Sequence, residues 1–279
     1  MSQSIQKLLK KYGLRPQKGL GQNFLSDQNT LNKIVHAAKI QPGDTVLEIG
    51  PGLGSLTILL AEKAERVIAV ELDKKLVAAL KEILSPYPNI ELIQGDILEV
   101  NLNLMFDQPG YLVAANIPYY ITSALLRQLL EANFAPKRVV LTVQKEVAQR
   151  ICAPAGKLSL LALSVQVYGK PEIAATIPAG AFYPTPKVDS AVVKIEIYPE
   201  PLIPRPQLDL FFSLTKAGFS QKRKTLLNAV SAGMAWEKPK TANLLQAAGI
   251  DPQRRAQTLD LEEWGQLVKL ASKQMNIKD

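Results

Sequence analysis

The chain of 279 residues contains one cysteine, Cys152, and one histidine, His36. A single cysteine cannot form an intramolecular disulfide, no Cys/His zinc site can be assembled, and a histidine-assisted nucleophile would have to use His36. No stretch reaches the roughly 18 consecutive apolar residues of a membrane span, and the opening residues lack the apolar core of a signal peptide. We therefore expect an intracellular, cytoplasmic protein with no bound metal.

Acidic residues are absent from the first 26 residues, which carry five basic groups. Residues 27–200 carry sixteen basic groups against eighteen acidic ones, and residues 201–279 carry twelve against seven. Two basic ends around a near-neutral body raise the local concentration of a polyanion such as a nucleic acid. Basic ends that only aid solubility would produce the same charge pattern, so the choice depends on the motifs.

Helical and strand-like patterns alternate from Thr30 onward. Apolar runs predict strands at 45–49, 66–71, 90–94, 111–116, 139–143, 172–177 and 190–198, and helical patterns fall at 27–39, 56–64, 74–84, 123–131 and 158–168. Apolar strands separated by helices indicate an α/β fold with a doubly wound, mostly parallel, seven-stranded Rossmann-like sheet. Because residues 190–198 alternate between apolar and charged, we expect there a half-exposed antiparallel strand near an edge.

A change in composition predicts a domain boundary near residue 200. Four prolines, Pro199, Pro201, Pro204 and Pro206, fall within eight residues, a density that neither a helix nor a central strand accepts. The basic segment beyond them is helical by pattern and small for independent stability. We expect a basic N-terminal segment at 1–26, a catalytic domain at 27–200 and a small all-α domain at 201–279.

A glycine-rich turn follows the first predicted strand, at Gly50-Pro51-Gly52-Leu53-Gly54. Such a turn lets the backbone approach a nucleotide at the carboxyl edge of the sheet. Glu71 ends the next strand, where it can accept hydrogen bonds from ribose hydroxyls, and Asp96 follows the third strand, where it can accept from an adenine amine. Ser55 and the spacing of the glycines depart from the dinucleotide fingerprint. The two carboxylates therefore favour S-adenosylmethionine as the cofactor.

The motif Asn116-Ile117-Pro118-Tyr119 ends the fourth predicted strand. The exocyclic nitrogen of adenine is a poor nucleophile because its lone pair is delocalised into the ring. The side-chain oxygen of Asn116 and the carbonyl of Ile117 can accept its two hydrogens and favour a more tetrahedral nitrogen. Pro118 lacks a competing N–H, and Tyr119 offers an aromatic face to a flipped base. This arrangement needs no general base.

At this point the chain resembles the small-subunit ribosomal RNA adenine dimethyltransferases, relatives of the enzymes that methylate large-subunit RNA in macrolide resistance. Besides the glycine turn, Glu71, Gly95-Asp96 and Asn116-Ile117-Pro118-Tyr119, the resemblance rests on Gly21-Gln22-Asn23-Phe24-Leu25, Phe182-Tyr183-Pro184-Thr185-Pro186-Lys187-Val188-Asp189-Ser190 and Phe219-Ser220-Gln221-Lys222-Arg223-Lys224-Thr225-Leu226. It implies an S-adenosylmethionine-dependent enzyme that transfers four methyl groups to two adjacent adenosines in a hairpin loop near the 3′ end of small-subunit (16S) ribosomal RNA.

The resemblance also assigns roles to individual residues. It implies cofactor contacts from Asn23, Leu25, Gly50, Gly52, Glu71, Asp96 and Asn116. Pro184 and Pro186 should stiffen a loop near Tyr119, so that Phe182 and Tyr119 sandwich an adenine; the alternative is that Phe182 packs in the protein core. Lys222, Arg223 and Lys224 should open a helix of the second domain and lie on RNA phosphates; the alternative is a solvated charged face without a ligand. The expected partner is the immature small subunit, and the expected state is a monomer.

Three alternatives stay open at this stage. A large-subunit adenine methyltransferase would share the catalytic motif, although the segment 219–226 favours the small subunit. A nicotinamide-dependent dehydrogenase is disfavoured by Ser55 and by the lack of an obvious proton donor. A non-catalytic RNA-binding or assembly factor is disfavoured by the intact motif at 116–119.

Overall fold

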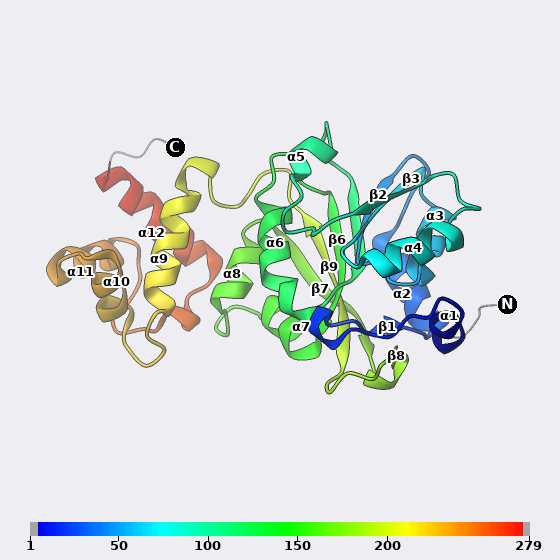
Figure 1. Ribbon diagram of the computed structural model, residues 1–279. Coiled ribbons are helices and arrows are strands. Elements are labelled where there is room, and N and C mark those ends of the chain that lie inside the picture. Colours follow the sequence, from blue (N-terminus) through cyan, green and yellow to red (C-terminus); the bar gives the residue numbers. More distant parts are fainter. Residues whose placement is uncertain (1–4, 276–279) are drawn as a thin grey trace. The chain divides into compact units, whose positions relative to one another are not determined.

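The computed structural model describes residues 5–275 and contains a seven-stranded sheet with the strand order β4-β3-β2-β5-β6-β9-β7 (Figure 1). Its strands are β2 (Thr45–Ile49), β3 (Arg66–Glu71), β4 (Ile90–Gln94), β5 (Leu112–Asn116), β6 (Arg138–Gln144), β7 (Gly169–Ile177) and β9 (Ser190–Ile197). The five strands from β4 to β6 pair in parallel, and β9 pairs antiparallel with β6. The predicted doubly wound, mostly parallel seven-stranded sheet is confirmed.

The helices of the described residues include those that the sequence pattern predicts and also three, at Ile5–Lys11, Leu102–Met105 and Lys145–Ile151, that it does not. They are α1 (Ile5–Lys11), α2 (Gln28–Ala38), α3 (Ser55–Ala61), α4 (Lys74–Ile83), α5 (Leu102–Met105), α6 (Thr122–Leu130), α7 (Lys145–Ile151), α8 (Leu160–Gln166), α9 (Leu208–Phe219), α10 (Leu226–Met234), α11 (Lys238–Ala247) and α12 (Leu261–Gln274). The Asp27 carboxylate caps α2 by accepting from the Thr30 N–H at 2.8 Å, as predicted. In the described range no helix is both long and apolar enough to cross a membrane.

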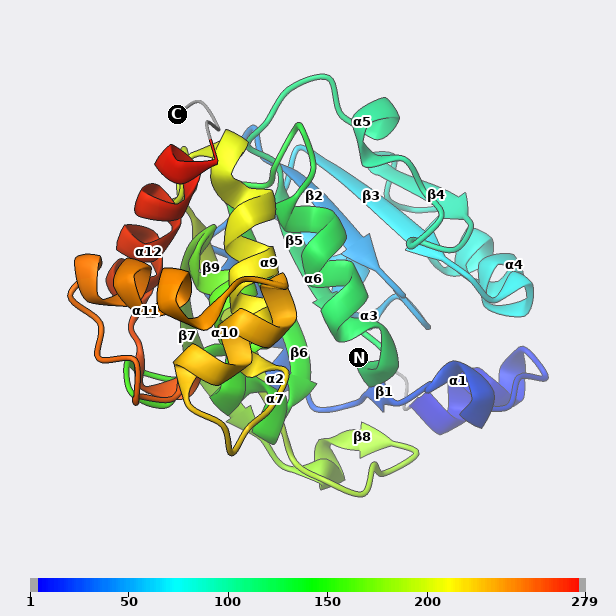
Figure 2. The same ribbon diagram turned by 90° about the vertical axis from the view of Figure 1, so that its left-hand side faces the viewer.

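Both faces of the sheet are buried at its central strands, whereas the edge strands β4 and β7 are partly exposed. Alternate strand residues, among them Val46, Leu112 and Val140, form one core cluster with the apolar faces of α2 and α3. The intervening residues, such as Leu47 and Val113, point to the other face and are equally buried. Figure 2 shows α6 lying over that part of the sheet. A sheet covered on both sides leaves a ligand access only at its edges and ends.

The prediction that residues 190–198 form a half-exposed strand near an edge was right about direction and wrong about exposure. The strand β9 is antiparallel and lies near an edge, between β6 and the edge strand β7, but residues 190–195 are buried. Lys194 is only 8% exposed because its ammonium pairs with Glu172 of β7 at 2.7 Å. Glu196 pairs with Arg138 of β6 at 2.8 Å. Cross-strand ion pairs, and not solvent, therefore accommodate the charged half of the alternation.

The chain divides into two compact units. One comprises residues 1–149 and 171–197, and the other comprises residues 150–170 and 198–279. This division differs from the expected boundary because residues 150–170, which include α8, group with the C-terminal helices. The second unit is otherwise helical, with α9 to α12 and short 3₁₀ turns at Arg205–Gln207 and Ala256–Thr258.

The N-terminal segment is built into the first unit. Ile5 and Leu9 of α1 form a small core with Phe24, Leu53 and Leu76. Phe24–Leu25 (β1) pairs antiparallel with Phe182–Tyr183 (β8) in a separate two-stranded sheet. Lys11 also pairs with Glu82 of α4 at 2.8 Å, so part of the basic charge of residues 1–26 is used within the protein. Residues 1–4 of this expected segment, like residues 276–279, lie outside the described range.

Candidate functional site

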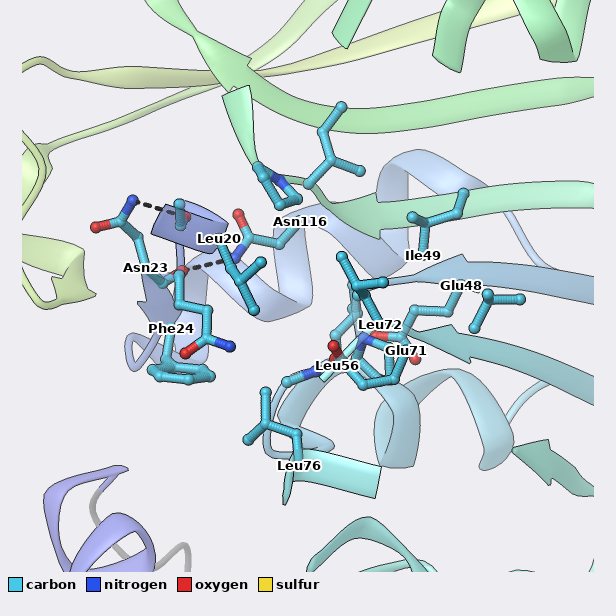
Figure 3. A pocket seen from close by; sticks show the side chains of 18 of the residues that line it. Leu20, Asn23, Phe24, Glu48, Ile49, Leu56, Glu71, Leu72, Leu76 and Asn116 are labelled. Atoms are coloured by element: carbon cyan, nitrogen blue, oxygen red, sulfur yellow. Dashed lines mark hydrogen bonds between the residues drawn. The ribbon is translucent and has the colours of Figure 1, made fainter. Parts of the chain in front are cut away.

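A pocket opens at the carboxyl ends of β2, β3, β4 and β5, where the strand order reverses between β2 and β5. Ligands of doubly wound sheets bind outside such a switch point. All ten residues predicted for catalysis and cofactor binding line this pocket: Asn23, Leu25, Gly50, Gly52, Glu71, Asp96, Asn116, Ile117, Pro118 and Tyr119. Figure 3 shows Asn23 and Asn116 on one side of the pocket and Glu48 and Glu71 on the other.

The glycine turn forms the floor of the pocket. Gly50, Gly52 and Gly54 have φ angles of 66°, 63° and 79°, a left-handed conformation that side chains disfavour. A Cβ at Gly52 would lie 3.0 Å from the Phe24 ring, so this ring and the turn are in close contact. A Cβ at Gly50 would meet no atom within 4 Å. The turn therefore leaves open space for a ligand above Gly50.

Replacing Gly50 by alanine is expected to weaken S-adenosylmethionine binding at least about tenfold, or about 1.4 kcal/mol, because the new methyl group occupies this space. Gly249 is a matched control, since it has a φ of 73° and also no atom within 4 Å of its Cβ position. Both variants should lose about 1–2 kcal/mol of stability from backbone strain. Isothermal titration should separate them. Equal dissociation constants for the two variants would contradict this role of Gly50.

Glu71, at the end of the neighbouring strand β3, holds the glycine turn through hydrogen bonds. One carboxylate oxygen accepts from the Gly52 N–H at 3.1 Å and the other from the Asp73 N–H at 2.9 Å. Burial raises the pKa of Glu71, and the backbone N–H groups oppose that rise. Each oxygen keeps a further lone pair for a ligand. Glu71 can therefore hold the glycine turn and accept from ribose hydroxyls at the same time.

Glu48 lies near Glu71 and is 1% exposed. One of its carboxyl oxygens is buried without a hydrogen-bond partner in the described part of the chain. Burial raises the pKa of Glu48 to about 8, and the nearby negative charge of Glu71 contributes in the same direction. At neutral pH Glu48 is consequently uncharged, which avoids two adjacent negative charges under the turn.

The free energy of unfolding should fall as pH rises from the ordinary pKa of 4.5 to about 8 at Glu48, since only the unfolded state then loses this proton. The loss amounts to at most about 5 kcal/mol. Glu48→Gln cannot titrate, so its stability should change less over this interval. Urea unfolding at about pH 5 and about pH 8.5 measures both slopes. If the free energy of unfolding changed equally with pH in the wild type and in Glu48→Gln, Glu48 would not carry a proton in the folded state.

Asp96 and two apolar neighbours complete the cofactor side. Asp96 accepts from the Leu98 N–H at 2.9 Å with one oxygen, which leaves the second oxygen for an amine donor. Leu72 and Ile97, which directly follow Glu71 and Asp96, also line the pocket. Leu72 is 43% exposed although it is apolar. A purine ring fits apolar walls next to a carboxylate acceptor.

The orientation of the Asn116 side chain is set by the N-terminal segment. Its amide nitrogen donates to the backbone carbonyl of Asn23 at 3.0 Å (Figure 3). Because a carbonyl can only accept, the NH₂ group must face Asn23 and the amide oxygen is left as the free acceptor. Within residues 5–275, neither this oxygen nor the carbonyl of Ile117 receives a hydrogen bond from the protein. Both acceptors of the predicted motif are therefore available.

The N-terminal segment is held in place by a residue that the sequence analysis did not single out. Asp73 caps α4 and accepts from the side-chain amides of Gln17 at 2.6 Å and Gln22 at 2.9 Å. A Cβ at Gly21 would lie 3.2 Å from Pro118, so this segment also touches the loop after β5. Other lining residues that the sequence analysis missed are Leu20, Phe24, Tyr120 and Leu72. An apolar residue directly after each strand-end carboxylate is the one signal that could have found Leu72.

The segment from Phe182 to Ser190 differs from the expectation in one respect. Phe182 is 3% exposed and packs in the core cluster with α2, and it does not line the pocket. Pairing of β8 with β1 turns its ring inward, so this ring does not form the expected sandwich with Tyr119 in the structure. The loop with Pro184 and Pro186 leads to Ser190, whose hydroxyl lies 2.6 Å from that of Tyr119. The segment thus does reach the Tyr119 loop.

Lys222, Arg223 and Lys224 lie in the exposed turn between α9 and α10, and not in a helix as expected. Thr225 caps α10, so the three cations precede the helix N-terminus. None of them has an acidic partner within the described range. Cations next to a helix N-terminus are unfavourable for the helix, which is consistent with an anionic ligand at this turn.

Comparisons with known proteins agree with what the geometry of this site indicates. A family described as "Ribosomal RNA adenine dimethylase" matches residues 13–273. A relative from Dehalococcoides mccartyi (strain CBDB1), named "Ribosomal RNA small subunit methyltransferase A", is 52% identical over 262 residues, which cover 93% of this chain and 90% of the relative.

Two solved structures share the architecture over most of the chain. A dimethyladenosine transferase from Plasmodium falciparum matches with a TM-score of 0.78 and 30% identity, covering 91% of this chain and 98% of that one. The 23S rRNA methyltransferase ErmE matches with a TM-score of 0.73 and 29% identity, covering 89% of this chain and 99% of that one.

Proposed function

The chain belongs to the ribosomal RNA adenine dimethylase family, and we propose that it dimethylates the N6 amines of two adjacent adenosines in a hairpin loop near the 3′ end of small-subunit (16S) ribosomal RNA. It is an S-adenosylmethionine-dependent ribosomal RNA methyltransferase. The observation that carries the proposal is the orientation of the Asn116 amide, which leaves an acceptor oxygen at the end of β5.

The residues around the glycine turn fit the cofactor. The open space above Gly50 would accommodate it, and Glu71 would accept from the ribose hydroxyls. Asp96 would accept from the adenine amine, between the apolar side chains of Leu72 and Ile97. Asn23 and Leu25 would close the opposite side. When bound, S-adenosylmethionine supplies an electrophilic methyl group on a sulfonium.

The chain's own residues act on the target adenine by positioning. An adenosine flipped out of its stack would lay its ring against Tyr119. The Asn116 side-chain oxygen and the Ile117 carbonyl would accept the two amine hydrogens and draw electron density toward the nitrogen. The nitrogen releases one proton to solvent for each methyl group that it gains, so a single N–H remains as the donor in the second transfer. Stabilisation of a developing charge by fixed dipoles requires no general base at this site.

We assign the binding of ribosomal RNA to three exposed cations and to the loop with Pro184 and Pro186. Lys222, Arg223 and Lys224 are exposed and without acidic partners in the described range, as phosphate contacts require. Pro184 and Pro186 would shape the loop that faces the RNA backbone. We further propose that the monomer acts in the cytoplasm on the immature small subunit.

The family match and the relatives bear on two of the alternative functions. Family membership excludes the dehydrogenase. The large-subunit enzyme ErmE shares the fold at 29% identity, whereas the relative named for the small subunit is 52% identical. The difference favours the small subunit as substrate.

Mass spectrometry of ribosomal RNA tests the proposal directly. Unmodified small and large subunits are incubated separately with the purified chain and S-adenosylmethionine. Two adjacent dimethyladenosines should appear in the small-subunit RNA and none in the large-subunit RNA. Methylation of the large-subunit RNA alone would support the alternative, and methylation of neither RNA would overturn the proposal.

A further inference from the structure

Tyr119 is fixed to the protein at both of its ends. It begins a 3₁₀ turn, Tyr119–Ile121, and its backbone carbonyl accepts from the Thr122 hydroxyl at 2.9 Å. Its phenol oxygen lies 2.6 Å from the hydroxyl oxygen of Ser190. The ring is half-buried and lines the pocket. Rotation of the ring about its side-chain bonds is therefore restrained by the hydrogen bond to Ser190.

Ser190 is in turn held rigidly by the sheet. It is the first residue of β9, is 0% exposed and pairs with Gln144 of β6. The carbonyl of the preceding Asp189 accepts from the Lys145 N–H at 3.0 Å. The Asp189 carboxylate accepts from the Ala179 N–H at 3.1 Å. The backbone that carries the Ser190 hydroxyl is thus held by two segments, residues 144–145 and the segment at Ala179.

We propose that Ser190 is a positioning residue for methyl transfer, whose hydroxyl holds the Tyr119 ring in the orientation that receives the target adenine. The inference rests on the proposed function. Asn116 and Tyr119 come from the same loop, but the protein orients them independently, through Asn23 and through Ser190. The amine reaches the two acceptors only while the base lies on the ring. A small misplacement of a reacting group lowers the rate by up to about 100-fold.

Three variants test this inference on full-length protein with unmodified small subunits. Tyr119→Phe and Ser190→Ala each remove one side of the hydrogen bond and keep the aromatic ring. Each should lower kcat about 10- to 100-fold and leave the KM for S-adenosylmethionine within about twofold. The double variant should be no slower than the slower single variant, because both substitutions remove the same interaction.

Two matched controls remove buried hydroxyls that have no partner within the described residues. Tyr111→Phe corresponds to Tyr119→Phe, and Ser231→Ala corresponds to Ser190→Ala. Both controls should methylate at the wild-type rate. They show whether the loss of a buried hydroxyl by itself affects activity.

The outcomes separate the inference from the proposed function. Wild-type kcat in both Ser190→Ala and Tyr119→Phe, or losses that add in the double variant, would overturn the positioning role. In either case the active wild type would leave the proposed function standing. An inactive wild type would overturn the proposed function itself. Tyr119→Phe preserves the packing of the strand, so the test does not depend on the folding of Ser190→Ala.

Discussion

Asn116→Ala is expected to lower kcat for methyl transfer by about 10²- to 10³-fold, the loss typical of removing one preorganised group from a developing charge. The dissociation constant of S-adenosylmethionine should rise much less, because the glycine turn, Glu71 and Asp96 remain. Isothermal titration and single-turnover methylation of small subunits measure the two quantities. Full methylation by this variant would contradict the mechanism.

A second substitution at Asn116 tests whether the contact with Asn23 is needed to orient the acceptor oxygen. Asn116→Asp keeps an acceptor oxygen but replaces the NH₂ group that donates to the Asn23 carbonyl. Two oxygens would then face each other, so the side chain should turn and the rate should fall as well. Normal activity in Asn116→Asp would show that the contact with Asn23 does not orient the site.

Glu71→Ala is expected to raise the dissociation constant of S-adenosylmethionine about 10- to 100-fold. The substitution removes the ribose acceptor and leaves the backbone N–H groups of Gly52 and Asp73 without their carboxylate. Hydrogen bonds to a charged group contribute roughly 1.5–3 kcal/mol each. Isothermal titration measures the change, and an unchanged dissociation constant would remove Glu71 from the cofactor site.

Glu91→Ala provides the control for this measurement. Glu91 lies on the adjacent strand β4, is exposed and pairs with Arg66. Exposed ion pairs contribute about 0–1 kcal/mol, so its removal should leave cofactor binding unchanged. Glu71→Gln retains one acceptor oxygen and should give an intermediate dissociation constant.

The sequence predicted the cofactor side of the pocket more completely than the RNA side. Glu71 and Asn116 end strands, and Gly50 directly follows one; the apolar runs of these strands are unambiguous, and parallel strands bring their carboxyl ends together. Phe182 was misplaced because its neighbours in space come from β1 and α2, more than 140 residues earlier in the chain. The turn at 222–224 was misplaced by a few residues because the helix start depends on the Thr225 cap.

The order of residues along the chain was enough to determine the α/β alternation, the glycine turn and the positions of the polar side chains at the strand ends. Short-range patterns suffice for these features because each strand and its following turn are continuous in sequence. Only the tertiary structure decided which way the Asn116 amide is turned, which charges on β9 are paired and which aromatic ring faces the pocket. Each of these depends on a contact between residues more than 20 positions apart, from Asn23 to Asn116, Glu172 to Lys194 and Tyr119 to Ser190. Such contacts form only when the whole sheet is assembled.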